Sequence, residues 1–309
     1  MFEMIAVVVG AAISASAPII YASLGETISQ RSGVMNLGLE GVMLVGAIVG
    51  YKTATETGSL AAAMLMVVLS GALLGLLYAF LTVTMRTNQP VTGLAFVMVG
   101  EGLSGMLGKT VNAMANFGSF EKIGIPGLQS IPVLGTMLFR QDLLVYALYL
   151  LVPFLTWYIY RTQPGLKLRA LGENPAAMDA VGLNVFLPRY LYVIVGTILV
   201  AIGGAYITLA YTPSWANNIT AGKGWIASAL VIFAAWNPAR AALGGLLFGV
   251  IEIVGLRLQS SGVAVSSNLL SMLPYVVTVI VLIFSTGSFR KKRTAMPSAI
   301  GLPYDREMR

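Results

Sequence analysis

The sequence predicts an all-α protein that crosses a membrane many times. Of its 309 residues, 57% are hydrophobic and only 10% are charged, and the mean hydropathy is +0.83. Soluble domains carry about 25% charged residues, so this composition excludes an ordinary soluble protein. The polar stretches between the apolar segments are too short to bury a core of their own. We therefore expect a polytopic membrane protein without a soluble enzyme domain.

Charge and composition exclude several further classes. The net charge of +7 comes from basic residues in short loops and at the carboxyl end, whereas a nucleic-acid-binding protein gathers them on one face. Membrane orientation explains them better, and we expect no nucleic-acid partner. The chain has no Cys and no His, which removes disulfides, thiolate chemistry and histidine metal sites.

Apolar segments predict about nine membrane helices, within a range of 8–10. The first 20 residues lack the basic start of a secretory signal, so we interpret them as a first membrane helix, with a cleaved signal as the alternative. Two segments, 36–51 and 225–238, are short for a layer of about 30 Å and are expected to be broken or re-entrant. The nine segments are 4–22, 36–51, 60–85, 90–108, 141–160, 190–211, 225–238, 240–257 and 268–286.

Orientation follows from the distribution of Lys and Arg. With the amino terminus outside, the central loop 161–189 and the carboxyl tail 289–309 carry the strongest basic bias and are predicted to be cytoplasmic. The cluster at 290–293 is then most simply an orientation anchor beside anionic lipid. Residues 1–288 form the predicted membrane domain.

The stretch from Leu24 to Gly50 contains polar residues within apolar sequence. Glu26, Arg31, Asn36 and Glu40 are costly in a membrane unless they are paired or face water. Frequent glycines in the same stretch permit close backbone packing. We expect a broken, tightly packed region here.

Two further membrane segments carry polar groups. Glu101, and Asn112 just beyond its helix, suit a substrate path, although an ordinary outer-loop boundary explains them equally well. Glu252 lies in a glycine-rich helix, where it either lines the path or pairs with Arg257. Glu40 and Glu252 also occupy one helix in each half of the chain, a weak sign of internal duplication.

The central loop predicts a short docking helix. Asn174 is a suitable N-cap, and Pro175 suits the first helical position. Gly182 supplies a left-handed stop. A helix of about two turns is unstable alone in water, so a partner surface must hold it. Its apolar side would carry Ala177, Met178 and Val181.

Three separated motifs carry a resemblance to a known family. Gly165 to Ala177 reads GLKLRALGENPAA, and this motif resembles the coupling loop of ABC importer permeases for sugars, nucleosides and branched-chain amino acids, which inserts into a cleft on the ATPase subunit. The run from Glu26 to Met43 resembles the family's first motif, with Val42 where the family often has Met. The block beginning at Gly224 and containing WNP resembles a third.

The resemblance implies specific partners and roles. We expect a separate ATPase subunit, a second related permease, an extracytoplasmic substrate-binding protein and surrounding lipid, in the cell membrane of a prokaryote. No cofactor is expected: the chain lacks the GxxxxGK[ST] motif, so the partner subunit would bind ATP. The residues implied in ATPase coupling are Arg169, Gly172, Glu173, Asn174, Pro175, Met178, Val181 and Gly182. The candidate pathway residues are Asn36, Glu40, Glu101, Asn112 and Trp225.

The form LGLEG after Asn36 resembles the nucleoside and simple-sugar branch of the family. In length the chain resembles the shorter of two paired nucleoside permeases, which implies a heterodimer. A homodimeric permease for a ribose-like sugar is the alternative. An ion-coupled secondary transporter, using Glu40, Glu101 and Glu252, is the competitor from another class. A membrane enzyme is disfavoured by the absence of His, Cys, HExxH and GxSxG.

Overall fold

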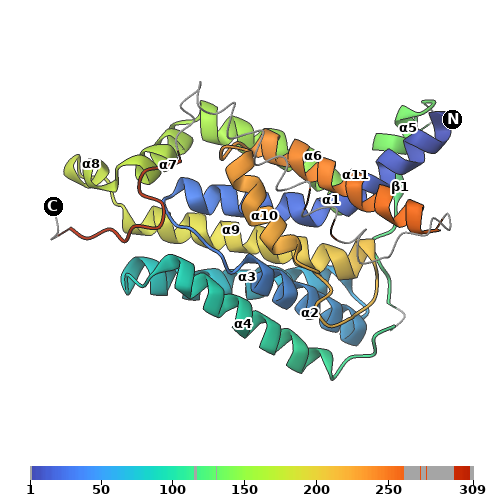
Figure 1. Cartoon of the computed structure of the whole chain (residues 1–309), viewed down its shortest axis with the longest axis horizontal. Helices are drawn as coiled ribbons and strands as arrows, with labels where there is room; N and C mark the ends of the chain where they lie inside the picture. The colour runs from blue at the N-terminus through green and yellow to red at the C-terminus, as the bar shows by residue number, and fades with distance from the viewer. Residues whose placement is uncertain are drawn as a thin grey trace.

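The computed structural model describes residues 2–114, 117–129, 131–260, 272, 276 and 296–306. Its architecture is a helical bundle. Figure 1 shows α1 and α9 lying side by side through the centre, with α2, α3 and α4 on one side, α6 and α11 on the other, and α10 crossing in front of α1 and α9. The main helices are α1 (Phe2–Arg31), α2 (Leu39–Thr57), α3 (Leu60–Ala79), α4 (Gln89–Gly108), α6 (Leu143–Arg161), α9 (Phe186–Tyr206), α10 (Lys223–Phe233) and α11 (Pro238–Ser260).

Six helices of the described chain are long and apolar enough to cross a membrane, in agreement with the predicted all-α membrane fold. They are α1, α4, α6, α11, α3 with its π-helical turn η1 (Phe80–Thr84), and α9 with η2 (Ile207–Tyr211). As predicted, the segment at 225–238 is short, because α10 has only 11 residues. The segment predicted at 36–51 begins with an extended break and then continues as α2 to Thr57. The segment predicted at 268–286 lies outside the described residues, apart from two isolated positions.

Glycines let the central helices approach until their backbones touch. A Cβ atom added to Gly25 of α1 would lie 2.2 Å from the carbonyl oxygen of Gly196 in α9. On α2, a Cβ at Gly46 would meet Ala201 of α9 at the same distance. Small residues at such crossings replace the hydrophobic driving force that lipid does not supply. The break between α1 and α2 and the half-length helix α10 therefore lie in a bundle whose central helices pack closely.

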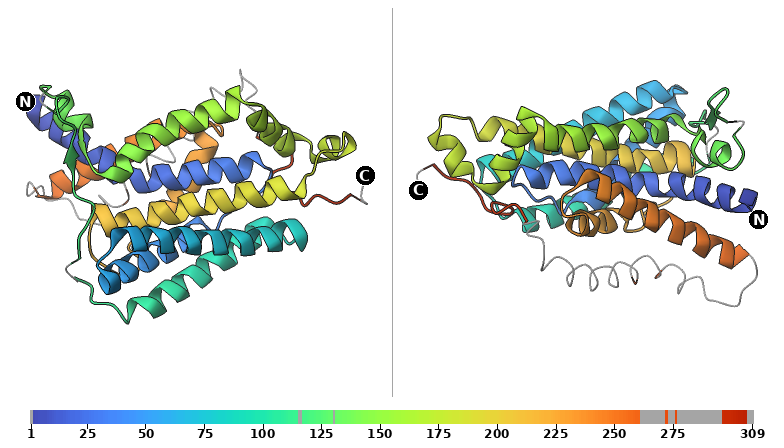
Figure 2. Two further views of the ribbon diagram at one scale, coloured as in Figure 1. Left: turned by 180° about the vertical axis from the view of Figure 1, so that it is seen from behind. Right: turned by 90° about the horizontal axis from the view of Figure 1, so that it is seen from above.

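The two ends of the bundle differ in character. One end carries the amino terminus, the short helix α5 (Leu134–Leu138) and a two-stranded antiparallel sheet of β1 (Ile123–Gly124) and β2 (Arg140–Gln141). The opposite end carries α7 (Gln163–Glu173), α8 (Pro175–Ala180) and residues 296–306, as both views in Figure 2 show. The predicted central loop is thus separated from the amino terminus by the length of the bundle.

Candidate functional site

The first turn of α10 is bound by a buried carboxylate from α2. Glu40 is 3% exposed, and its side chain accepts hydrogen bonds from the backbone N–H groups of Gly222 at 2.9 Å and Gly224 at 2.7 Å. The hydroxyl of Thr220 donates a third bond to the same carboxylate. A helix has unpaired N–H groups and partial positive charge at its amino terminus, so a carboxylate there supplies both missing partners and opposite charge. Glu40 thereby fixes the start of a half-length helix inside the bundle.

A second carboxylate reaches the same place from α11. Glu252 accepts a charge-assisted bond from the Nζ of Lys223 at 2.6 Å and a longer one from the Tyr211 hydroxyl at 3.4 Å. Of the two roles that the sequence leaves open for Glu252, the pairing with Arg257 is contradicted, because its partner is Lys223. Five positions along a helix correspond to about 140° around its axis, so the two side chains point to different sides.

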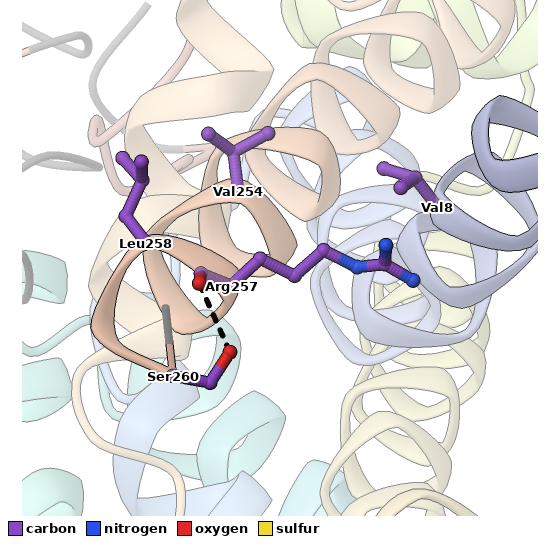
Figure 3. A pocket seen from close by; sticks show the side chains of 5 residues that line it. All are labelled: Val8, Val254, Arg257, Leu258 and Ser260. Carbon is purple, nitrogen blue, oxygen red and sulfur yellow. Dashed lines mark hydrogen bonds between the residues drawn. The ribbon is translucent and has the colours of Figure 1, made fainter. Parts of the chain in front are cut away.

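Arg257 instead lines a cavity of about 510 Å³ at the far end of α11. Figure 3 shows it with Val254, Leu258 and Ser260 of the same helix and with Val8 of α1. The hydroxyl of Ser260 donates to the backbone carbonyl of Arg257 at 2.9 Å. This cavity belongs to the end that carries the amino terminus.

The break between α1 and α2 is held by its own polar groups. The backbone N–H of Asn36 donates to Glu26 at 2.9 Å, and Glu26 also accepts from Gln30 at 2.7 Å. The side-chain oxygen of Asn36 accepts from the N–H of Gly38 at 2.8 Å. Asn36 is 2% exposed, so it stabilises the break in this conformation and presents no free surface to a ligand.

Glu101 lines a cavity of about 330 Å³ between α2, α4 and the segment before α10. Asn217 and Asn218 line the cavity with it. Ser104 and Leu44 also border the cavity but are only 3% and 1% exposed, and the Ser104 hydroxyl donates to the backbone carbonyl of Glu101 at 3.0 Å. The described residues that line this cavity include no cation. Such groups suit a polar, uncharged ligand that offers several hydrogen-bond donors.

The other predicted pathway residues are more dispersed. Trp225 is 39% exposed on α10, and Asn112 lies beyond the end of α4, where its carbonyl accepts from the Tyr51 hydroxyl at 2.7 Å. Sequence reasoning missed Asn217 and Asn218. Their position directly before the short apolar segment at 225–238 was the available signal, since unwound backbone beside a broken helix is where transporters place polar groups.

At the opposite end, the predicted capping of α8 is confirmed. The side-chain oxygen of Asn174 accepts from the N–H of Ala177 at 2.9 Å, and Pro175 is the first helical residue. Gly182 has a φ of +78°, the left-handed conformation that ends the turn. The helix itself has six residues, and α7 precedes it as a separate helix that was not predicted.

The apolar residues of this segment do not share one exposed side. Val181 is 72% exposed, whereas Met178 is 6% exposed and packs with Leu171, Val185 and Tyr304. The prediction that Met178 offers itself to a partner is therefore corrected. α8 ends at Ala180, so the three-residue spacing between Met178 and Val181 no longer places them on one face.

The remaining residues implied in coupling have internal roles. Gly172 is required by packing, because a Cβ there would lie 2.3 Å from the carbonyl oxygen of Arg31. The guanidinium of Arg169 lies over the ring of Tyr160 at 5.6 Å, a cation–π contact. Glu173 is exposed and accepts from the Ser298 hydroxyl at 3.1 Å.

Comparison with known proteins places this geometry in context. The family model described as the permease component of the branched-chain amino acid transport system matches residues 8–284. A nucleoside ABC transporter permease of Lactococcus lactis is 35% identical, over 94% of this chain and 93% of that protein. A guanosine ABC transporter permease of Bacillus subtilis is 31% identical, over 98% and 97%.

Two further matches widen the context. A Haloferax volcanii protein provisionally named as a glucose ABC transporter permease is 34% identical, over 96% of this chain and 97% of its own length. A solved inward-facing ABC transporter, provisionally of the metal-chelate type, has a TM-score of 0.54 at 15% identity. The alignment covers 90% of this chain and 85% of the other, a likeness of fold alone.

Proposed function

This chain belongs to the family of permease components of branched-chain amino acid transport systems and is the permease component of an ABC transporter, and we propose that it imports nucleosides. It is a multi-pass membrane protein, and its family implies an ATPase partner and a substrate-binding protein. The observation that carries the substrate proposal is the lining of the cavity at Glu101. A simple sugar is the second candidate, because a relative of similar identity carries a glucose name.

The cavity favours neutral polar molecules over amino acids. A free amino acid brings a carboxylate that needs a cationic or N–H-rich site, and the described lining has no cation. A nucleoside has hydroxyl and base N–H groups that can donate to Glu101 and to the two Asn side chains, and a sugar has hydroxyl groups that can do the same. The nucleoside is preferred because two relatives, at 35% and 31% identity, carry nucleoside and guanosine names.

The position of Glu101 also supports a second permease beside α4. Its side chain is exposed within a membrane-spanning helix, and a carboxylate facing lipid at that depth is strongly unfavourable. Its face of α4 must therefore border water or another protein. A pathway between two permeases supplies both, and we propose a second permease on that basis. That the second permease is a different, related chain rests on the resemblance in length to the shorter of two paired permeases.

In the proposed cycle, α8 contacts the ATPase subunit. ATP binding closes the ATPase pair, displaces α8 and shifts the permease from inward-facing to outward-facing. The binding protein then delivers substrate to the cavity. ATP can drive this exchange only through contacts that differ between the two states, so the proposal requires that α8 be bound differently in each.

The test is uptake of labelled guanosine, with ribose for comparison, into proteoliposomes that hold this chain with its co-purifying partners. Guanosine uptake that requires ATP supports the proposal. ATP-dependent uptake of ribose instead of guanosine would keep the ATP-driven import and identify a simple sugar as the substrate. Uptake driven by an ion gradient alone would refute the proposed ATP-driven cycle. Glu101→Gln keeps the size of the side chain and removes its charge, and we expect it to lower uptake without changing assembly with the ATPase.

A further inference from the structure

Residues 296–306, near the carboxyl end, lie along the helices proposed to meet the ATPase. In Figure 1 this segment, in dark red, begins beside α7 at the left end of the bundle and runs below α8 towards the carboxyl end. The backbone N–H of Ala299 donates to the carbonyl of Gly172 at the end of α7 at 2.9 Å. Ser298 donates to Glu173 at 3.1 Å. The segment is thus bound to α7 through both backbone and side chains.

Its strongest attachment is to Asp179 of α8. Arg306 binds this carboxylate through two nitrogens, with Nη2 at 2.7 Å from Oδ1 and Nε at 3.0 Å from Oδ2. The hydroxyl of Tyr304 donates to the same carboxylate at 2.8 Å. The Asp179 side chain is 6% exposed beneath these partners. A bidentate bond between Arg and carboxylate fixes distance and orientation together, so α8 is held to the segment at a defined angle.

The same segment also reaches α10. Ile300 is 7% exposed and packs in one cluster with Val231 of α10 and with Trp236 of the turn that follows it. Asp305 forms an ion pair with Arg86 in the connection between α3 and α4. Eleven residues of chain therefore touch the proposed ATPase-facing helix and the end of the half-length helix whose start is held by Glu40.

We propose that residues 296–306 form a strap that transmits the movement of α8 to α10, with the Asp179–Arg306 pair as its fixed point. The inference rests on the proposed role of α8. A six-residue helix is marginally stable on its own, so a displacement of α8 also acts on the residues that bind it. The strap supplies a second covalent stretch, bound at Asp179 and at Val231, through which displacement of α8 pulls on α10 and on the cavity side of the bundle.

A charge exchange tests the fixed point. Asp179→Arg and Arg306→Asp each place like charges together, and the double variant restores an opposite pair. The measurement is substrate transported per ATP hydrolysed, in proteoliposomes of the complete complex. We expect each single variant to lower this ratio about fivefold and the double variant to recover most of it, as for directly coupled residues. Single variants with an unchanged ratio, or a double variant no better than either single, would overturn the strap.

A matched pair of variants tests the contact with α10 should the exchanged charges prevent folding. Ile300→Ser removes the side chain packed against Val231, whereas Leu302→Ser alters a neighbour on the same strap that is 60% exposed. We expect Ile300→Ser to lower the amount of substrate transported per ATP hydrolysed and Leu302→Ser to leave this ratio unchanged. Equal behaviour of the two variants contradicts transmission through this contact.

Val181→Asp separates failure of the strap from failure of the proposed function. Val181 is 72% exposed at the end of α8. If Val181→Asp abolishes ATP-driven uptake while every strap variant transports normally, α8 docks the ATPase and the strap inference alone is wrong. If Val181→Asp transports normally and uptake does not depend on ATP, the proposed function is wrong and the strap fails with it.

Discussion

Replacing Glu40 by Ala should destabilise the permease by about 2–4 kcal/mol. The change leaves the N–H groups of Gly222 and Gly224 without their carboxylate, in a region where Glu40 is 3% exposed. Each unsatisfied buried donor costs about 1–3 kcal/mol, and loss of the charge at the start of α10 adds about 0.3–1 kcal/mol. The hydroxyl of Thr220 can rotate towards another acceptor, and water entering from the nearby cavity would offset part of the total, so the lower half of the summed range is expected.

The assay is reversible unfolding of the purified complex in mixed micelles, monitored by circular dichroism. Glu40→Gln keeps one acceptor oxygen, so we expect about half the loss seen for Ala. The matched control is Glu101→Ala, which removes an exposed carboxylate from α4, where no hydrogen bond to its side chain is described, and should leave stability within about 0.5 kcal/mol of the parent. A free energy of unfolding for Glu40→Ala equal to that of the control would refute the assignment of Glu40 as the cap of α10.

Three further substitutions test other contacts described above. Gly204→Ala would place a Cβ 1.9 Å from a carbonyl oxygen of α2 and should abolish folding as judged by the amount of monodisperse protein, whereas Gly102→Ala, with open space around it, should not. Lys223→Met leaves the Glu252 carboxylate without its 2.6 Å partner and should reduce stability by about 1–3 kcal/mol, while the double change with Glu252→Met should recover most of the loss in the same unfolding assay. Asn174→Ala removes the cap of α8 and should cost about 1 kcal/mol locally, seen as faster hydrogen exchange of the α8 amides; an unchanged exchange rate would contradict the capping role.

Local signals in the sequence were enough to predict the parts of the site that depend on neighbouring residues. The cap at Asn174, the stop at Gly182 and the short segment that became α10 each depend on backbone chemistry within a few positions. The pairing of Glu252 with Arg257, one of the two roles that the sequence leaves open, is contradicted for the complementary reason. Its true partner, Lys223, lies 29 positions away on another helix, and only the packing of α10 against α11 brings the two together.

Residues 296–306 show the same limit at the other end of the bundle. Taken by itself, the carboxyl tail is polar and basic, which predicts a lipid-facing anchor and nothing more specific. Its binding to α8 depends on Asp179, 127 positions before Arg306, and no periodicity or capping rule connects residues so far apart. The burial of Met178 follows from the same arrangement, since Tyr304 of the tail covers the face of α8 that was expected to meet a partner.

The two ends of α10 are held by different helices, and the strap reaches only one of them. At its start, Glu40 of α2 supplies charged and directional bonds within a buried site, and breaking them is costly. At its other end, Val231 and Trp236 pack with Ile300, while Arg31 of α1 donates to the carbonyl of Trp236 at 3.1 Å and the indole of Trp236 donates to Gln30 of α1 at 2.6 Å. A pull on the strap would therefore tilt α10 about Glu40 together with the end of α1 that is bound to it. Such a tilt would change the cavity at Glu101 and Asn218 while the buried hydrogen bonds of Glu40 stay intact. Hydrogen exchange of the Gly224 amide should consequently be equally slow with and without ATP, whereas that of amides near Phe233 should differ; a Gly224 amide that becomes exposed in either state would show that the cap opens and that α10 does not pivot there.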